Sequence, residues 1–417
     1  MINILKTMKN KQHLSTDILI LGAGIGGYTV FDHLANELKK NKIDKTITIV
    51  DQNNYFTFTP LLHEVASGSV EPQHATISLR ELIYKTPHHC LQTKVERILP
   101  QIKTVQTGLG DIHYEYCIIA LGSGVNFYNI LGAKKFSYSV RTLNEALHLR
   151  NDLIKKLENS PKELIINIIG GGYTGVEVAG QLSSLAKHDL KKLYPQTKID
   201  LNIIQSASTI APQLPKRAQE KIINRLKKLG VKIFFNSSVD EVREDKIILK
   251  DQILPSDVTV WCAGVDNFAA NFLDVNYCER GRLSVNEYLQ IDNLTDTYAI
   301  GDIACGHNQE ENSIYPQIGE VAQAQGKYVA KHLISKMIDK NIKPFHFKSK
   351  GTLMPIGDNY GVVVLRKNII LAGFFAWWLR RTVYLVFMPG KLRKIKIVIN
   401  WTLNLFGFKN IVGIGGN

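Results

Sequence analysis

Two glycine triads have the spacing that lets a protein backbone approach a phosphate. The triads are Gly22-x-Gly24-x-x-Gly27 and Gly170-x-Gly172-x-x-Gly175. In this pattern the first glycine permits a tight turn, the second lets the backbone reach a pyrophosphate, and the third lets helix and strand pack closely. The helix that follows offers unpaired N–H groups to phosphate oxygens. Each triad therefore predicts a dinucleotide site.

The residue that closes the next apolar stretch distinguishes the two sites. Asp51 ends the stretch 45–51, and its carboxylate can accept hydrogen bonds from both hydroxyls of a ribose. Gln205 ends the corresponding stretch 199–205 with a neutral amide. The economical interpretation is a tightly held flavin dinucleotide at the first triad and an exchanging nicotinamide dinucleotide at the second. A chain that binds both is built to move a hydride between them.

The elements around the triads form two β-α-β units, which predict parallel sheets with right-handed crossovers. The first unit has strands 17–24 and 45–51 around helix 26–41, and the second has strands 164–169 and 199–205 around helix 174–193. The fold class is α/β, with two Rossmann-like dinucleotide-binding domains. Further strands are expected at 115–121, 231–236, 246–250, 257–261 and 297–302, and further helices at 215–230 and 317–340.

The net charge of +14 is concentrated near the C-terminus, where no Asp or Glu follows Asp358. Such a charge permits nucleic acid, an anionic membrane or mere solubility. No nucleic-acid recognition motif is present, so a nucleic-acid partner is not expected. The longest uncharged apolar stretch, about 368–379, is too short to span a bilayer, and no secretory signal is expected.

The five cysteines are scattered, with no CxxC or CxxxxC pair. We therefore expect a reduced, cytosolic chain with no disulfide and no redox dithiol. No metal site is predicted.

Two later segments fit a flavoprotein. Val260-Trp261-Cys262-Ala263-Gly264 is a strand followed by a small-residue turn. Ala299-Ile300-Gly301-Asp302 resembles the second flavin-binding motif of the two-dinucleotide flavoprotein reductases, with a helix cap as the alternative role for Asp302. Within that group the chain resembles type II NADH dehydrogenase, the single-subunit NADH:quinone oxidoreductase. The resemblance runs from about residue 15 and is carried by YFTFTPLLHEVASG (55–68), GGGYTGVEVAGQL (170–182), GTLMPIGDNYGVV (351–363) and GFFAWWLRRTVYL (373–385).

The resemblance implies that NADH passes a hydride to flavin N5 and that reduced FAD passes two electrons to a membrane quinone without proton pumping. The residues expected to bind FAD are Gly22, Gly24, Gly26, Gly27, Asp51, Thr59, Pro60, Leu61, Gly122, Gly301 and Asp302. Those expected to bind NADH, or NADPH in its place, are Gly170, Gly172, Tyr173, Thr174, Gly175, Gln205 and Gly264.

Glu177 matches the family's acidic residue after the second triad, and so is the expected catalytic residue, positioning the nicotinamide or relaying protons. The alternative is a solvated acid favoured by the helix dipole. Pro60, Leu61 and Leu62 are expected to frame the quinone end of the flavin, unless this apolar run is simply core. The quinone contacts predicted from the resemblance are Leu62, Glu320, Gln323 and Ala324.

The helix that carries these last quinone contacts departs from the family pattern. A pair of glutamines four residues apart is usual, but Glu320 and Ala324 occupy those places, with Gln323 and Gln325 displaced. The expected domains are an FAD-binding domain in two parts (15–130 and 266–345), an NAD(P)H-binding domain (131–265) and a C-terminal membrane-association or dimerisation region (346–417).

Residues 391–409 predict an amphipathic helix with basic residues beside an apolar face, which suits the surface of an anionic membrane. Trp377, Trp378 and Trp401 suit the headgroup region. The alternatives are a dimer face or a helix packed on the body, and these can hold together with membrane binding. The expected location is the cytoplasmic face of a bacterial cell membrane, as a peripheral protein.

One other function remains open at this point, and a second is disfavoured by the positions of the cysteines. A soluble NAD(P)H oxidase, or another FAD-dependent pyridine nucleotide reductase, would leave the basic and aromatic C-terminal region unexplained. A sulfide:quinone oxidoreductase would need a cysteine pair across the flavin, with one partner in the C-terminal third, where the chain has no cysteine.

Gln205 predicts weak discrimination against NADPH. The family usually has an acidic residue here, and a carboxylate repels a 2′-phosphate whereas an amide does not. We expect kcat/KM for NADH to exceed that for NADPH by less than about a thousandfold, or ~4 kcal/mol. Steady-state kinetics with both donors measures this ratio, and a larger preference for NADH would contradict the role given to Gln205.

Overall fold

The computed structural model describes residues 14–159, 161–267, 272–273, 278, 281–308, 313–365, 369–388, 390–403 and 409. The chain divides into two compact units built from interleaved stretches. Unit 1 takes the described parts of Met1–Phe58, Thr76–Gly124 and Val265–Lys348, and unit 2 takes those of Thr59–Ala75, Val125–Gly264 and Ser349–Asn417. The four-part domain division expected from the sequence stays a prediction.

Unit 1 is organised around a mixed sheet in the order β5-β2-β1-β8-β7-β6, with β19 also paired to β8. Strands β5, β2, β1, β8 and β19 run parallel, and β7 and β6 turn back antiparallel. Ile18 to Leu21 in β1 are fully buried, as expected for a strand covered on both faces. The strands are β1 (Leu14–Leu21), β2 (Ile47–Asp51), β5 (His89–Gln92), β6 (Val95–Leu99), β7 (Thr104–Thr107), β8 (Gly110–Ile119) and β19 (Thr297–Ala299).

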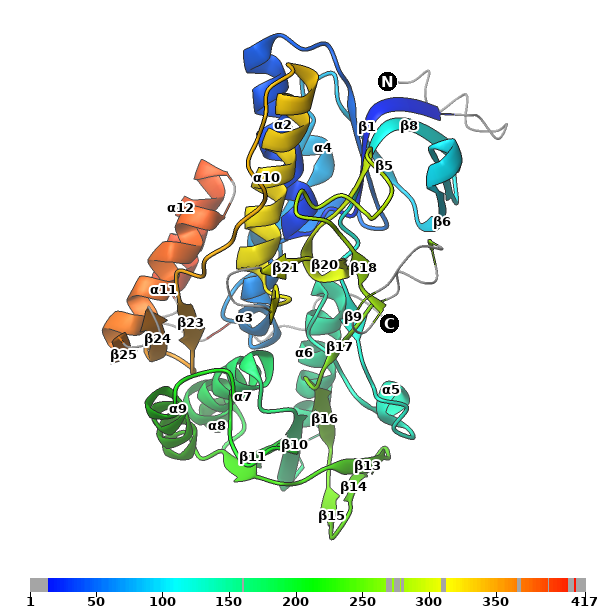
Figure 1. Ribbon diagram of the computed structural model, residues 1–417. Helices are drawn as coiled ribbons and strands as arrows, with labels where there is room; N and C mark the ends of the chain where they lie inside the picture. Colours follow the sequence, from blue (N-terminus) through cyan, green and yellow to red (C-terminus); the bar gives the residue numbers. More distant parts are fainter. Residues whose placement is uncertain are drawn as a thin grey trace. The chain divides into compact units, whose positions relative to one another are not determined.

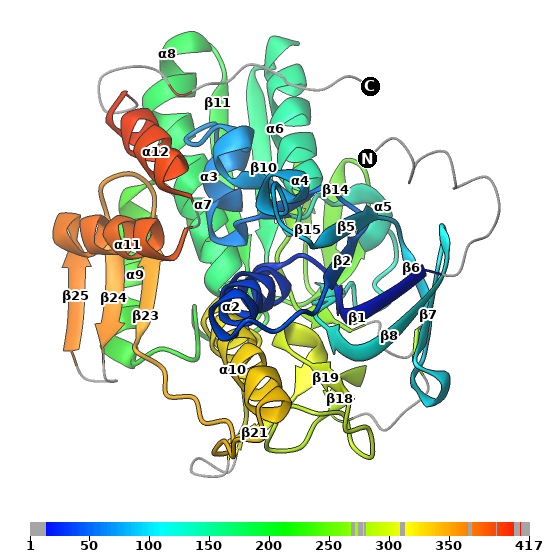
Figure 2. The same ribbon diagram turned by 90° about the horizontal axis from the view of Figure 1, so that it is seen from above.

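Two helices of unit 1, α2 (Ile25–Asn41) and α10 (Gly319–Met337), lie side by side in both views (Figures 1 and 2). Their close approach depends on Gly326, where an added Cβ would lie 2.8 Å from the carbonyl oxygen of Gly26. The smaller elements of unit 1 are β3 (Tyr55–Thr57), β4 (Thr76–Ser78), α4 (Leu79–Leu82), η3 (Pro100–Ile102), β18 (Leu283–Ser284), η7 (Gly301–Ile303), β20 (Ala304–Cys305), β21 (His307–Asn308) and β22 (Ser313–Ile314). The long middle stretch of unit 2 begins within β9 (Gly124–Val125) and ends just before β17 (Val265–Asp266).

Unit 2 contains the second parallel sheet, in the order β12-β11-β10-β16. Helix α7 (Tyr173–Leu185) continues through η4 (Ala186–Leu190) into α8 (Lys191–Leu193), which accounts for the single helix predicted over 174–193. The strands are β10 (Glu163–Ile169), β11 (Lys198–Ile204), β12 (Lys232–Phe234) and β16 (Val258–Trp261). A separate antiparallel sheet has β13 (Val239–Val242), β14 (Lys246–Leu249) and β15 (Ile253–Pro255), and the other helices are η1 (Thr59–Leu61), α3 (Leu62–Ala66), η2 (Pro72–His74), α5 (Ala133–Phe136), α6 (Leu143–Glu158) and α9 (Lys216–Lys228).

The C-terminal part of unit 2 is a three-stranded antiparallel sheet followed by two helices. Figure 2 shows helix α11 (Phe374–Phe387) beside the sheet of β23 (Thr352–Pro355), β24 (Gly361–Leu365) and β25 (Ile369–Gly373), which it contacts. Helix α12 (Lys391–Leu403) follows, and residues 404–408 of the predicted helix lie outside the described residues. Among the described helices none is both long and apolar enough to cross a membrane.

Both predicted β-α-β units are confirmed, and with them the α/β fold class. The predicted helices 26–41, 215–230 and 317–340 correspond to α2, α9 and α10 with ends shifted by a few residues. The sheet β23-β24-β25 was not predicted from the sequence.

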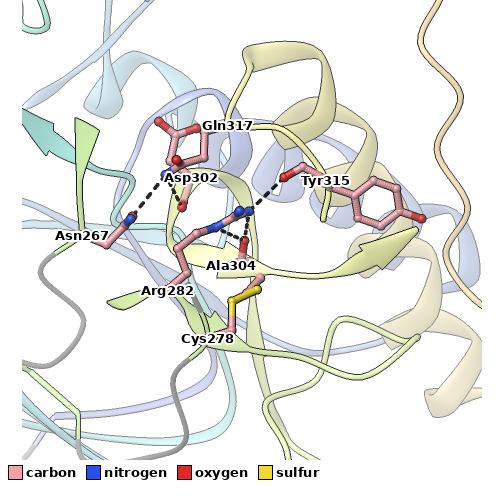
Figure 3. The surroundings of a disulfide bond; sticks show 8 residues. Asn267, Cys278, Arg282, Asp302, Ala304, Tyr315 and Gln317 are labelled. Atoms are coloured by element: carbon pink, nitrogen blue, oxygen red, sulfur yellow. Dashed lines mark hydrogen bonds between the residues drawn. A yellow bond between two sulfur atoms is a disulfide. The ribbon is translucent and has the colours of Figure 1, made fainter. Parts of the chain in front are cut away.

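The prediction that every cysteine is reduced is wrong, because Cys278 and Cys305 form a disulfide. The two cysteines are 27 residues apart in the sequence, and the parallel pairing of β18 with β20 brings their segments together. No short sequence motif therefore predicts the disulfide. Figure 3 shows Arg282 beside the disulfide, donating hydrogen bonds to the carbonyl oxygens of Ala304 and Tyr315. Cys90, Cys117 and Cys262 are free thiols.

Candidate active site

The first glycine triad forms a turn at the start of α2 that only small residues can make. Gly22 has φ +95°, and an added Cβ would collide with the backbone of Ala120. Gly27 packs directly on the carbonyl of Gly22, whereas a Cβ at Gly24 would meet nothing within 4 Å. No side chain caps α2, and its first turn carries no acid. The turn therefore presents backbone N–H groups next to open space, as a pyrophosphate requires.

Asp51 lies beside the first glycine turn, where a bound dinucleotide needs an acceptor for its ribose hydroxyls. Its Oδ2 accepts the N–H of Ala23 at 2.7 Å, and its Oδ1 accepts the N–H of Asn53 at 2.7 Å. Burial raises the pKa of Asp51, against the lowering effect of these two donors. The carboxylate is held at the glycine turn and keeps lone pairs for further donors.

The loop Gly301–Asp302 is held from three directions. Ser123 donates to Asp302 Oδ2 at 2.6 Å, and Gln317 donates to the Asp302 carbonyl at 2.9 Å. Gln325 on α10 accepts the N–H of Gly301 at 2.7 Å. Figure 3 shows Gln317 reaching Asp302 and Asn267. These contacts make Asp302 part of a braced loop and not merely a helix cap.

Gln325 is a functional candidate that the sequence analysis set aside as a displaced glutamine. It is fully buried, and its Nε2 has no hydrogen-bond partner within the described part of the chain. A buried amide donor without a partner beside the Gly301–Asp302 loop fits a bound polar group. Gly122 and Gly301 both have positive φ, whereas Gly26 is a packing position against Ile300. Together with Asp51 and the open turn, these residues of unit 1 fit FAD.

The second triad, in unit 2, repeats the geometry of the first. Gly170 has φ +101° and a Cβ there would lie 2.9 Å from the Ala263 nitrogen, while a Cβ at Gly172 would meet nothing within 4 Å. Gly175 packs on the carbonyl of Gly170. Helix α7 also lacks a side-chain cap and a first-turn acid. Tyr173 is half-buried, Thr174 is exposed, and Gly264 leaves room for the ring of Tyr128; the residues fit a second dinucleotide.

Gln205 supports this turn from the side. Its Oε1 accepts the N–H of Gly171 at 2.9 Å, and its Nε2 donates to the Thr209 carbonyl at 3.1 Å. Gln205→Glu keeps an acceptor for Gly171, adds a negative charge and removes the donor to the Thr209 carbonyl. It is therefore the matched variant for the NADPH comparison and should widen the preference for NADH.

Glu177 belongs to a buried charge cluster, defined by His63, Glu64, Glu177, Arg380 and Arg381. It follows the second triad directly on α7, and its side chain is 18% exposed. Burial raises the pKa of Glu177 to about 7, opposed by Arg380 and reinforced by Glu64. The alternative of a solvated surface acid does not hold for this side chain.

Glu64 and Arg380 form the centre of the cluster, and each side chain is 1% exposed. Arg380 Nη1 donates to Glu64 Oε1 at 2.7 Å, and the indole Nε1 of Trp401 donates to Glu64 Oε2 at 3.0 Å. Burial alone would raise the pKa of Glu64, but Arg380 and Arg381 outweigh it and lower the pKa to about 2. Arg381 lies between the rings of Trp377 and Trp401, 3.8 and 4.4 Å from their centroids.

His63 connects this ion pair to Glu177. Arg380 Nη2 lies 3.1 Å from His63 Nε2, and His63 Nδ1 lies 3.7 Å from Glu177 Oε2. A guanidinium only donates, so Nε2 is the acceptor and the ring proton of neutral His63 is on Nδ1, facing Glu177. Burial, and then Arg380, lower the pKa of His63 to about 3. The imidazole is therefore neutral at physiological pH.

The sequence analysis did not single out His63, Glu64 or Arg380. A signal was present, because PLLHEVA places two polar residues inside an apolar run that forms the buried helix α3. Arg380, on α11, is more than 300 residues further along the chain, and only the tertiary structure reveals its place.

The remaining predicted residues fall into different environments. Leu61 and Leu62 are 1% and 2% exposed, and Thr59 and Pro60 precede them in η1 with greater exposure. Glu320, Gln323 and Ala324 are half-buried on α10 in unit 1. The quinone contacts assigned to these side chains stay predictions.

The model of the family described as "Pyridine nucleotide-disulphide oxidoreductase" matches residues 16–326, which include both triads. The chain belongs to this family. Among relatives, it is 28% identical to the internal alternative NAD(P)H-ubiquinone oxidoreductase A1 of Solanum tuberosum, covering 93% of this chain and 86% of the relative. It is 27% identical to the type II NADH:quinone oxidoreductase of Haemophilus influenzae, covering 82% and 85% respectively.

Within the oxidoreductase family, the fold is similar to that of NDH2 from Plasmodium falciparum, solved in complex with NADH. The TM-score is 0.85 at 21% identity, and the match covers 95% of this chain and 99% of the other. These relatives confirm the predicted resemblance to type II NADH dehydrogenases.

The buried pair of Glu64 and Arg380 should be costly to break. Arg380→Ala removes the cation nearest to the buried Glu64 carboxylate, so we expect the free energy of unfolding to fall by roughly 3–5 kcal/mol. Chemical denaturation measures the loss. Arg217→Ala, on the exposed side of α9, is the control and should change stability by less than about 0.5 kcal/mol. A similar small effect for both variants would contradict the buried pair.

Proposed function

We propose that the chain is an FAD-dependent NADH:quinone oxidoreductase that does not pump protons. The observation that carries this proposal is that one chain holds two uncapped glycine turns of the same geometry, and that the second is followed by the partly buried acid Glu177, whose pKa is raised to about 7. The first turn suits a resident flavin dinucleotide, because Asp51 and Gln325 accompany it. The second suits the donor, in agreement with the names of the relatives.

Bound FAD would supply the capacity to accept a hydride and to release electrons in turn to a quinone. The residues of unit 2 bind and orient the nicotinamide dinucleotide through the N–H groups at the start of α7. Glu177 holds or releases a proton at its carboxylate, and a pKa of about 7 lets it do both at neutral pH. Reduction of a quinone to a quinol consumes two protons, and an acid beside the second glycine turn can hold and release a proton for this step.

The decisive test is the colour of the purified protein. It should be yellow, lose its flavin absorbance on addition of NADH without oxygen, and regain it on addition of a short-chain quinone. Absence of bleaching would refute the proposal. Recovery with oxygen but not with quinone would support the soluble NAD(P)H oxidase instead.

We further propose that helix α12 attaches the protein to an anionic membrane. Its exposed side carries an apolar stripe, the α12 stripe, made of Ile395 (56% exposed), Val398 (43%), Ile399 (52%) and Leu403 (63%). Lys396 is exposed on the same helix, and no acidic residue follows Asp358 in the sequence. An apolar stripe flanked by cations matches a helix lying in the membrane interface. The cytoplasmic face of a bacterial membrane and a homodimer stay predictions.

The tryptophans play a different part from the one predicted. Trp377 and Trp401 are 5% and 6% exposed, because they pack on Arg381, and only Trp378 remains 56% exposed. Helix α12 thus packs on the rest of unit 2 through the side where Ile397 and Trp401 are buried. The α12 stripe lies on the opposite, exposed side. The expected headgroup role is therefore wrong for Trp377 and Trp401.

Changing the α12 stripe should weaken membrane binding without unfolding the protein. Ile395→Asp combined with Ile399→Asp removes two exposed apolar side chains and adds negative charge, so binding to phosphatidylglycerol vesicles should fall roughly tenfold or more. Vesicle co-sedimentation measures it. Ile253→Asp, at a 62% exposed position of β15, is the matched control and should bind as the unmodified protein does. Equal binding by all three would refute this anchor.

A further inference from the structure

The buried charge cluster joins four helices of unit 2 through polar contacts. His63 and Glu64 come from α3, Glu177 from α7, and Arg380 from α11. Trp401 comes from α12, the helix that bears the α12 stripe, and its indole donates to Glu64. The neighbouring Asn400 accepts the N–H of Glu71 at 3.3 Å. Consecutive residues of α12 are thus bonded to the segment that carries His63 and Glu64.

The hydrogen-bond directions show what this cluster cannot do. His63 faces Glu177 with Nδ1, and its Nε2 is occupied by Arg380. On its far side His63 faces Arg380, which does not give up its proton, and Glu64 Oε1, which lies 3.8 Å from His63 Nε2 and belongs to a carboxyl group whose pKa is lowered to about 2. Glu64 and Arg380 are each 1% exposed, whereas Glu177 is 18% exposed, so Glu177 meets water on its own exposed side. The buried partners act on Glu177 only through charge and position.

We propose that Glu64 is a positioning residue for the acid–base chemistry of Glu177 and that it acts through Arg380 and His63. Because Trp401 donates to Glu64, this arrangement depends on where helix α12 packs. This inference rests on the proposed function, since it concerns the proton that accompanies quinone reduction. Neither Glu64 nor Trp401 is proposed to touch the reacting atoms.

The charges around Glu177 fix the sign of the effect. The groups that face it are His63 and Glu64 from α3, Arg380 and Tyr384 from α11, and the thiol of Cys262 after β16. Arg380 favours the ionised form of Glu177, and Glu64 disfavours it. Glu64→Gln removes the negative charge and leaves the positive charge of Arg380 uncompensated. The loss of this negative charge favours ionised Glu177, and the unaltered charge of Arg380 continues to favour it.

Removing Trp401 should have the opposite effect on the protonation of Glu177, and this effect also passes through Glu64. The N–H of Trp401 donates to Glu64 Oε2 and so partly offsets the charge of that carboxylate. Trp401→Phe keeps a buried ring over Arg381 but removes this donor. The field of Glu64 at Glu177 then becomes more negative, so Glu177 should retain its proton to higher pH.

The test is an infrared pH titration of the oxidised protein without NADH or quinone. The carboxylic C=O band that disappears in Glu177→Gln reports the protonation of Glu177. In Glu64→Gln its titration midpoint should move down by about one pH unit or more. In Trp401→Phe it should move up, and in the double variant the Trp401 change should have no further effect, because Trp401 acts only through Glu64.

Trp377→Phe is the matched control, because Trp377 stacks on the same Arg381 without a hydrogen bond to Glu64 among the described contacts. Its midpoint should stay at that of the unmodified protein. An unchanged midpoint in Glu64→Gln, or an equal Trp401→Phe shift in both backgrounds, would overturn the proposal. Circular dichroism and flavin content verify that each variant is folded.

The outcome is separable from that of the proposed function. If the unmodified protein fails to reduce quinone while the midpoints shift as described, the proposed function is wrong and the coupling is real. If turnover is normal but the midpoints do not move, only the coupling is wrong.

Discussion

The structure of unit 2 depends on the ion pair between Glu64 and Arg380. Taking two charges out of water is expensive, and the expense is met only when each charged atom has a well-placed partner. Here the partners come from helices that are far apart in sequence, since Glu64 and Trp401 are 337 residues apart. The arrangement of helices α3, α11 and α12 gives both Glu64 oxygens a donor, and a shift of one helix would break these contacts in a low-dielectric interior. The pair specifies the assembly that surrounds Glu177 more than it adds to stability.

The two glycine turns have the same local geometry but suit two different dinucleotides. In each, the side chain that ends the second strand accepts the N–H of the residue after the first glycine: Asp51 from Ala23, and Gln205 from Gly171. The bracing of the turn is thus the same, and only the charge of the acceptor differs. A carboxylate and an amide fill this structural role equally well, which leaves the choice between them free to set ligand preference.

The sequence predicted what is local and missed what is distant. Apolar runs and glycine spacing located β10, β11 and the continuous helical run from α7 to α8 to within about a residue, because the periodicity of strands and helices is visible among neighbouring residues. The disulfide of Cys278 and Cys305, and the contact of Trp401 with Glu64, depend on pairings across the chain that no spacing encodes. The amphipathic pattern of α12 was recognised, but its tryptophan was placed on the wrong side. A helical pattern shows that two faces exist and does not show which one the protein covers.

The arrangement of His63 also bears on energy conservation. Moving a proton from one side of a membrane to the other requires a path with an entrance and an exit, along which each group can both receive and release a proton. Among the described residues, the contacts that begin at Glu177 reach His63 and then Arg380 and Glu64, whose side chains are each 1% exposed. The described contacts therefore give a proton an entrance at Glu177, whose side chain is 18% exposed, and show no exit beyond Glu64 and Arg380 within the described part of the chain.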